Sequence, residues 1–138
     1  MSYHVLDPDD LPGSPDHPCD RRSITEAVGL HALQLARYEL APGETLATEY
    51  HSHDRREEAF YVLSGTLVVE TPERTYEVPA DRLFVVTPDS PLRPYNPASA
   101  TEPVRVLGIG APLVDIGQPY RPAVEDVDGP DEDGSSPD

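Results

Sequence analysis

Lysine is absent from this chain, and Cys19 is its only cysteine. A single thiol excludes an internal disulfide, and the His17-Pro18-Cys19 run lies in a proline-rich segment where we interpret it as incidental. No apolar run is long enough for a transmembrane helix, and the first residues lack the basic-then-apolar pattern of a secretion signal. We therefore expect a cytoplasmic protein that has no membrane partner.

The charge of the chain is strongly one-sided. All ten basic residues are arginines, and against 26 acidic residues they leave a net charge of −16. Such a balance argues against nucleic acid and anionic membranes as partners. An acidic, lysine-free composition resembles that of haloarchaeal proteins, in which dense carboxylates keep the surface hydrated in molar salt. A GC-rich genome that favours arginine codons would explain the missing lysine but not the acidity.

Histidine is also scarce, and none follows His53. With so few histidines, no Ser-His-Asp or Cys-His nucleophilic arrangement is credible, and glycine-rich phosphate loops are absent. His51 and His53, however, alternate onto one face of a strand, where two imidazoles can hold one metal ion. Glu58 opens the next strand after a charged turn. Two imidazoles and a carboxylate form a ligand set that suits Fe(II), Mn(II), Ni(II) or Zn(II).

Short apolar and β-branched runs, separated by turn residues every eight to twelve positions, predict an all-β sandwich or barrel with no convincing helix. We expect the run at 82–86, continuously apolar after its arginine, to be a central buried strand. The expected strands cover residues 31–40, 51–53, 58–64, 66–70, 75–78, 82–86, 92–96 and 104–109.

The chain divides into three parts by composition. Residues 1–29 are rich in proline and aspartate and predict an extended arm that packs across the domain, with a short strand at 21–25. The strands occupy residues 30–112. Residues 113–138 form a C-terminal extension, and its acidic end cannot bury enough apolar surface to offset the entropy of ordering, so we expect a disordered tail.

The spacing around the two histidines resembles the first motif of the cupin superfamily. His51 and His53 are followed by four residues, Glu58, six residues and Gly65. The resemblance implies a small double-stranded β-helix, or jelly-roll barrel, over about residues 30–112. It also implies a metal in the barrel cavity and a homodimer, because small cupins commonly pair their barrels through edge strands.

The second cupin motif is incomplete. Pro88 and Asn96 stand where the motif has them, but its glycines and its histidine are replaced. Counting back from Asn96 places Leu92 in the histidine position, which we prefer, whereas counting forward from Pro88 places Arg93 there. Leu92 would add an apolar wall and leave water to complete the metal shell. Arg93 would face the metal with a cation and pair with Glu58, bind an anionic group of a ligand, or lie solvated on the surface.

Two functions fit this pattern. The first is a metal-dependent enzyme, dioxygenase-like or isomerase-like, that acts on a small organic molecule. The second is a non-catalytic binding or sensing module whose metal site is degenerate or holds no metal. In either case we expect Tyr61, Phe84, Leu92, Arg93 and Tyr95 to contact the ligand in the cavity.

The halophile interpretation predicts that the protein needs salt, because counterions must screen the mutual repulsion of its 26 acidic residues. Thermal unfolding in dilute buffer should therefore occur well below its midpoint in molar KCl. Calorimetry in the two buffers measures the difference, and equal midpoints would remove the halophile interpretation.

Overall fold

The fold is built almost entirely from strands, in a computed structural model that describes residues 1–47, 50–114 and 117–119. A short 3-10 helix, η1 (Pro8–Asp10), and one short α-helix, α1 (Ile24–Val28), precede most of them. No helix of the described residues is long and apolar enough to cross a membrane. The strands are β1 (Asp20–Ser23), β2 (Gln34–Leu40), β3 (His51–His53), β4 (Glu57–Ser64), β5 (Thr66–Glu70), β6 (Thr75–Pro79), β7 (Leu83–Val86), β8 (Arg93–Tyr95), β9 (Val104–Ala111) and β10 (Gly117–Pro119).

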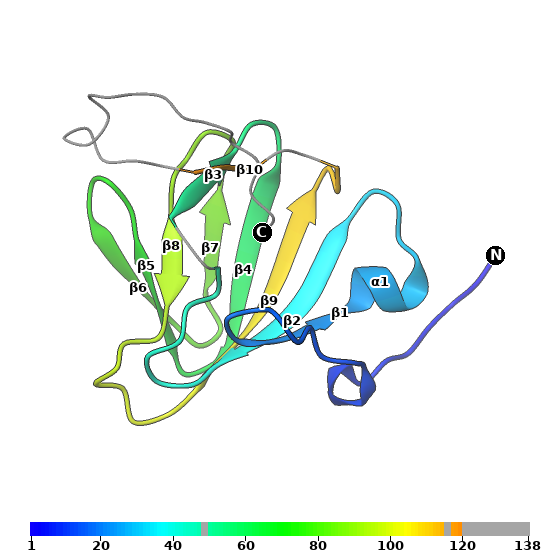
Figure 1. The fold of residues 1–138 in the computed structure, drawn as a ribbon, viewed down its shortest axis with the longest axis horizontal. Helices are drawn as coiled ribbons and strands as arrows, with labels where there is room; N and C mark the ends of the chain where they lie inside the picture. Colours follow the sequence, from blue (N-terminus) through cyan, green and yellow to red (C-terminus); the bar gives the residue numbers. More distant parts are fainter. Residues whose placement is uncertain (48–49, 115–116, 120–138) are drawn as a thin grey trace.

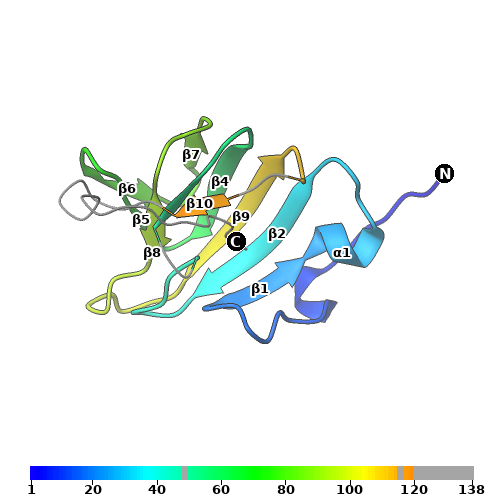
Figure 2. The same cartoon turned by 45° about the horizontal axis from the view of Figure 1, so that its top comes forward.

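The strands form two main antiparallel sheets. The larger has the order β1-β2-β9-β4-β7, and the smaller has the order β6-β5-β8. The third pairing joins β3 to β10 at the upper end of the barrel in Figure 1. Figure 2 shows the two main sheets facing each other. This arrangement confirms the expected double-stranded β-helix.

The core lies between the facing sheets and follows from strand alternation. On β9 every second residue from Val104 onward is buried, and on β4 Phe60 and Val62 are buried while Leu63 is exposed. Because side chains alternate along a strand, one face of each strand is buried in the core and the other faces solvent or the N-terminal arm. The buried apolar cluster consists of Cys19, Ala36, Tyr38, Leu40, Leu46, Phe60, Val62, Leu67, Val69, Val78, Val86, Leu92, Val104 and Val106.

The prediction that residues 82–86 form a central buried strand is wrong. β7 is the edge strand of the larger sheet, and the side chains of Leu83 and Val85 are 57% and 67% exposed. Only Val86 is fully buried, and Phe84 is half-buried. A continuous apolar run indicates a strand, but strand order depends on the pairing of distant segments, which the run itself does not encode.

The N-terminal arm packs on its own domain and contains regular elements. β1 extends the larger sheet, and the strand expected at 21–25 ends at Ser23. There the Ser23 hydroxyl accepts a hydrogen bond from the Glu26 amide and caps α1. Further upstream, Asp9 forms an ion pair of 2.9 Å with the buried Arg37, which holds the pKa of the Asp9 carboxyl below its usual range.

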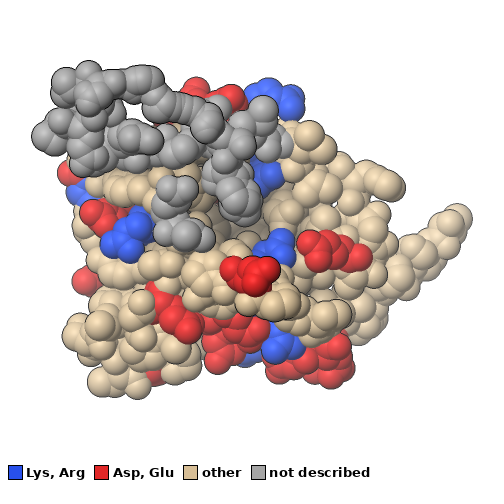
Figure 3. Space-filling view, viewed as in Figure 1, with Lys and Arg blue, Asp and Glu red and all other residues tan. Residues whose placement is uncertain are grey.

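Charged side chains lie on the face seen in Figure 3, where acidic groups gather toward the lower edge with arginines among them. The expected disordered tail lies outside the described residues.

Gly65 makes the one-residue connection between β4 in one sheet and β5 in the other. Its φ is +78°, and a Cβ there would lie 2.5 Å from the Pro103 carbonyl oxygen. Gly29, which ends α1 with a φ of +82°, has no atom within 4 Å of that position.

These two glycines separate backbone strain from crowding. We expect Gly29→Ala to cost about 1 kcal/mol, the strain of a left-handed non-glycine residue. Gly65→Ala should cost about 3 kcal/mol, because the backbone of β9 must also move. Denaturant unfolding in molar KCl measures both, and equal losses would contradict the packing of Gly65 against Pro103.

Candidate functional site

Both histidines of the first motif are buried on β3. The backbone of β3 pairs with β10 along one side, while on the other side His51 forms a bridge with Leu92. The imidazole rings of His51 and His53 are edge to face, with centroids 5.1 Å apart. The expectation that the two rings share one face of the strand is therefore met.

Glu58 lies on the neighbouring strand β4, opposite Val86 on one side and Gly110 on the other. Its side chain is 13% exposed, and its Oε2 lies 3.7 Å from Nε2 of His53. The structure thus brings the carboxylate beside one imidazole and that imidazole beside the other.

The donor types fit a divalent metal, since neutral imidazoles and a carboxylate are ordinary ligands of such ions. Their arrangement is pairwise, however. Among residues 1–47, 50–114 and 117–119, no three histidine, cysteine, aspartate or glutamate side chains surround a common point as a metal requires. A metal at this position would therefore need the side chains of His51, His53 and Glu58 to turn toward one another.

The structure places Leu92, and not Arg93, beside the histidines. The backbone bridge sets Leu92 directly opposite His51, and residues directly opposite in an antiparallel pair project to the same side. Leu92 is buried. Arg93 turns the other way, where its guanidinium donates to Glu70 Oε1 at 2.9 Å and lies 4.4 Å above the ring centre of Tyr95.

Three of the five residues expected to contact a ligand in the cavity point away from it, namely Arg93 and the two tyrosines Tyr61 and Tyr95. Tyr61 alternates to the outer face of β4 and donates to Asp81, whose carboxylate also raises the pKa of the phenol. Tyr95 stacks with Arg93 on the outer side of β8. Phe84 does face inward and packs against the core.

Arg56 is a further residue of this site, although the sequence around it indicates only a charged turn. Its buried side chain lines a small cavity together with His51, Glu58 and Leu92. The guanidinium donates to the carbonyl oxygens of Pro112 at 3.1 Å and Leu113 at 2.6 Å, and so ties the chain after β9 to this end of the barrel. Alternation could have found Arg56, because it lies two residues before Glu58 and shares its face.

Gly110 makes room for that arginine. A Cβ on Gly110 would lie 2.8 Å from Cδ of Arg56 and 3.4 Å from Cγ of Glu58. The cavity that remains holds about 20 Å³ of free space, which is enough for one water molecule or ion and not for an organic substrate.

The only thiol of the chain takes no part in this site. Burial in the core raises the pKa of Cys19 to about 12, so the thiolate that nucleophilic attack requires is not formed near neutral pH.

Comparison with solved structures finds the same fold at low sequence identity. A sugar phosphate isomerase of the cupin superfamily from Silicibacter pomeroyi has a TM-score of 0.71 and 17% identity, covering 85% of this chain and 82% of its own. The polyketide cyclase RemF from Streptomyces resistomycificus has a TM-score of 0.69 and 21% identity, with 83% and 82% covered. A predicted oxalate decarboxylase from Thermotoga maritima has a TM-score of 0.63 and 17% identity, with 80% and 100% covered.

A comparison with curated proteins finds no significant match. The family model described as a cupin domain, in contrast, matches residues 36–110, from within β2 to within β9. This match spans more than half of the chain and includes both histidines, Glu58 and Leu92. Together with the double-stranded β-helix, it establishes that the chain belongs to the cupin domain family.

Proposed function

We propose that His51, His53 and Glu58 hold one divalent metal ion, Fe, Mn, Ni or Zn, at the end of the barrel. The observation that carries this proposal is that the three side chains lie next to one another at a largely buried position. The ring centres of His51 and His53 are 5.1 Å apart, and Nε2 of His53 lies 3.7 Å from Oε2 of Glu58. His51 and Glu58 line the small cavity, and rotation of the three side chains toward it would bring the donors to one ion.

The activity we infer is that of a small cupin enzyme, dioxygenase-like or isomerase-like, on a small organic molecule. The structural neighbours include a sugar phosphate isomerase, a polyketide cyclase and a predicted oxalate decarboxylase, which supports a catalytic role for this fold without selecting one reaction. A bound metal with only three protein ligands would supply a Lewis acid with open positions.

The residues around the donors would shape that chemistry. Leu92 closes one side of the cavity with an apolar wall. Arg56 holds the carbonyl groups of Pro112 and Leu113, which keeps the chain after β9 against the strands that carry the donors.

The alternative is a non-catalytic module that binds a small ligand. Leu92 in place of the motif histidine removes one imidazole, and the donors are arranged pairwise. Loss of a ligand lowers metal affinity and selectivity. The binding module therefore gains support if the protein holds no metal.

We also propose a homodimer. Leu63, Leu83 and Val85 are exposed on or beside the edge strand β7, whose outer side has no partner strand among the described residues. An unpaired edge with apolar side chains is a surface that a second copy can cover.

Metal binding is tested with protein purified in molar KCl without chelators. Elemental analysis should find about one metal ion per chain, and Co(II) titration should give visible absorption bands from imidazole ligation. His51→Ala and His53→Ala should each weaken Co(II) binding at least about tenfold. His31→Ala is the matched control, since His31 is exposed and does not line the cavity beside His51. If the purified protein contains no metal and Co(II) produces no absorption bands, the non-catalytic binding module is the correct alternative.

The geometry of Leu92 predicts that the lost ligand can be restored. Leu92→His should raise Ni(II) affinity about tenfold or more, because the new imidazole would lie directly opposite His51. Arg93→His should have little effect, since that side chain turns toward Glu70. Calorimetric titration compares the two variants, and a larger gain in Arg93→His would contradict the pairing of Leu92 with His51.

A further inference from the structure

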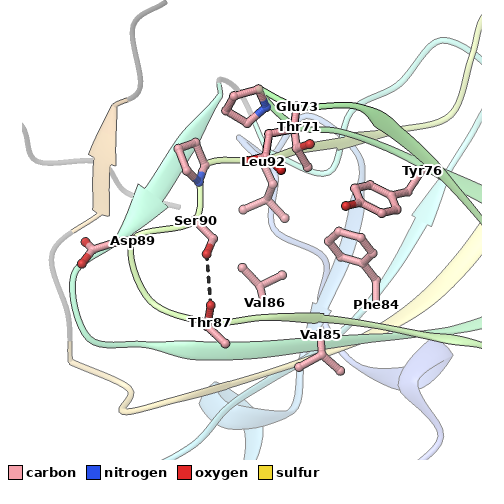
Figure 4. A pocket seen from close by; sticks show the side chains of 12 residues that line it. Thr71, Glu73, Tyr76, Phe84, Val85, Val86, Thr87, Asp89, Ser90 and Leu92 are labelled. Carbon is pink, nitrogen blue, oxygen red and sulfur yellow. Dashed lines mark hydrogen bonds between the residues drawn. The ribbon is translucent and has the colours of Figure 1, made fainter.

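A second cavity, of about 430 Å³, opens between the hairpin of β5 and β6, the edge strand β7 and the loop that leads into β8. Figure 4 shows Tyr76, Phe84, Val86 and Leu92 around it. Its volume is typical of small-molecule sites, whereas the space beside His51 has room for an ion alone. Of these two cavities, the larger one is able to accept an organic molecule.

The walls combine aromatic faces with hydroxyl groups. The rings of Tyr76 and Phe84 meet edge to face at 63° with centroids 5.2 Å apart, and both residues line the cavity, where an aromatic ligand can pack against them. The hydroxyl oxygens of Thr87 and Ser90 lie 3.1 Å apart in a hydrogen bond at another side of the cavity. They can exchange this bond for one with a polar group of a ligand.

The charge of the lining is negative. Glu73 and Asp89 belong to it, and among the described residues no arginine or histidine does. The guanidinium of Arg74 lies nearby but stacks on the ring of Tyr76, 4.6 Å from its centre. A carboxylate or phosphate in this cavity would lose its hydration without gaining a cation.

The larger cavity adjoins the histidines through a shared wall residue and a backbone hydrogen bond. Leu92 forms part of the wall of both cavities. The amide of Asp89, in the lining loop, donates to the carbonyl oxygen of His53 at 2.7 Å. A molecule in the larger cavity would thus be separated from the histidines by the side chain of Leu92.

We propose that this cavity binds an uncharged aromatic molecule that carries a hydroxyl or carbonyl group. Its ring contacts Tyr76 and Phe84, and its polar group replaces the hydrogen bond between Thr87 and Ser90. Binding itself requires no metal. That this molecule is the substrate class of the protein rests on the proposed function.

The test compares two probes of similar size, 2-naphthol, which is uncharged at pH 7, and the anion 2-naphthoate. Metal-free protein in molar KCl is titrated with each by calorimetry. We expect 2-naphthol to bind at least about tenfold more tightly, because desolvation of the carboxylate is not compensated even where salt screens the charges. Absent binding of 2-naphthol, or equal or tighter binding of 2-naphthoate, would overturn the proposal.

Variants locate the binding. Phe84→Leu keeps an apolar side chain without the ring and should weaken 2-naphthol about fivefold. Tyr3→Leu makes a comparable aromatic-to-leucine change at an exposed residue near the N-terminus, on the other side of the molecule from this cavity, and as the matched control it should leave the affinity unchanged. Glu73→Arg alters an exposed residue and should improve 2-naphthoate binding. Unchanged 2-naphthol affinity in Phe84→Leu, or unchanged 2-naphthoate affinity in Glu73→Arg, would place the ligand elsewhere and overturn the proposal.

The same measurements keep the two proposals apart. His51→Ala should lose metal affinity yet bind 2-naphthol as the wild type does. Loss of 2-naphthol binding in His51→Ala would contradict a cavity that works without metal. A wild type that binds Co(II) but not 2-naphthol would overturn the cavity proposal alone, and the reverse result would overturn the metal proposal alone.

Discussion

The backbone pairing of His51 with Leu92 is the contact on which both cavities depend. The His51 amide donates to the Leu92 carbonyl at 3.3 Å, and the Leu92 amide donates to the His51 carbonyl at 3.0 Å. Because directly opposite residues project to the same side, an imidazole and an apolar side chain face each other inside the barrel. This bridge holds His51 against the segment that leads into β8 and sets Leu92 between the small space beside His51 and the larger cavity.

Features that depend on neighbouring residues could be predicted from the sequence. The strand expected at 66–70 is confirmed, because a run of β-branched residues is a local signal. The choice between Leu92 and Arg93 could not be settled by counting, since the register is set by pairing with His51. The central position expected for residues 82–86 was wrong for the same reason, because the order of strands is a property of the whole sheet.

The residues expected at the ligand site show the same difference between local features, which the sequence predicts, and contacts between distant segments, which it does not. Tyr61 could have been rejected by alternation, because it lies three residues from Glu58 and so faces the other way. Alternation also predicts that Arg56 lies on the same face as Glu58. Its acceptors, the carbonyl groups of Pro112 and Leu113, are 56 and 57 residues distant, and no local pattern identifies such partners.

The few cations of this acidic chain join segments that are distant in sequence. Arg22, Arg37 and Arg105 all approach Asp9 and attach the N-terminal arm to the larger sheet. Arg56 attaches the chain after β9. Arg37 is fully buried, so salt screens its pair with Asp9 less than it screens exposed pairs. These arginines form contacts within the fold, and none belongs to the described lining of the larger cavity. Ligands would therefore be selected there by shape and by the cost of desolvation, and not by ion pairing.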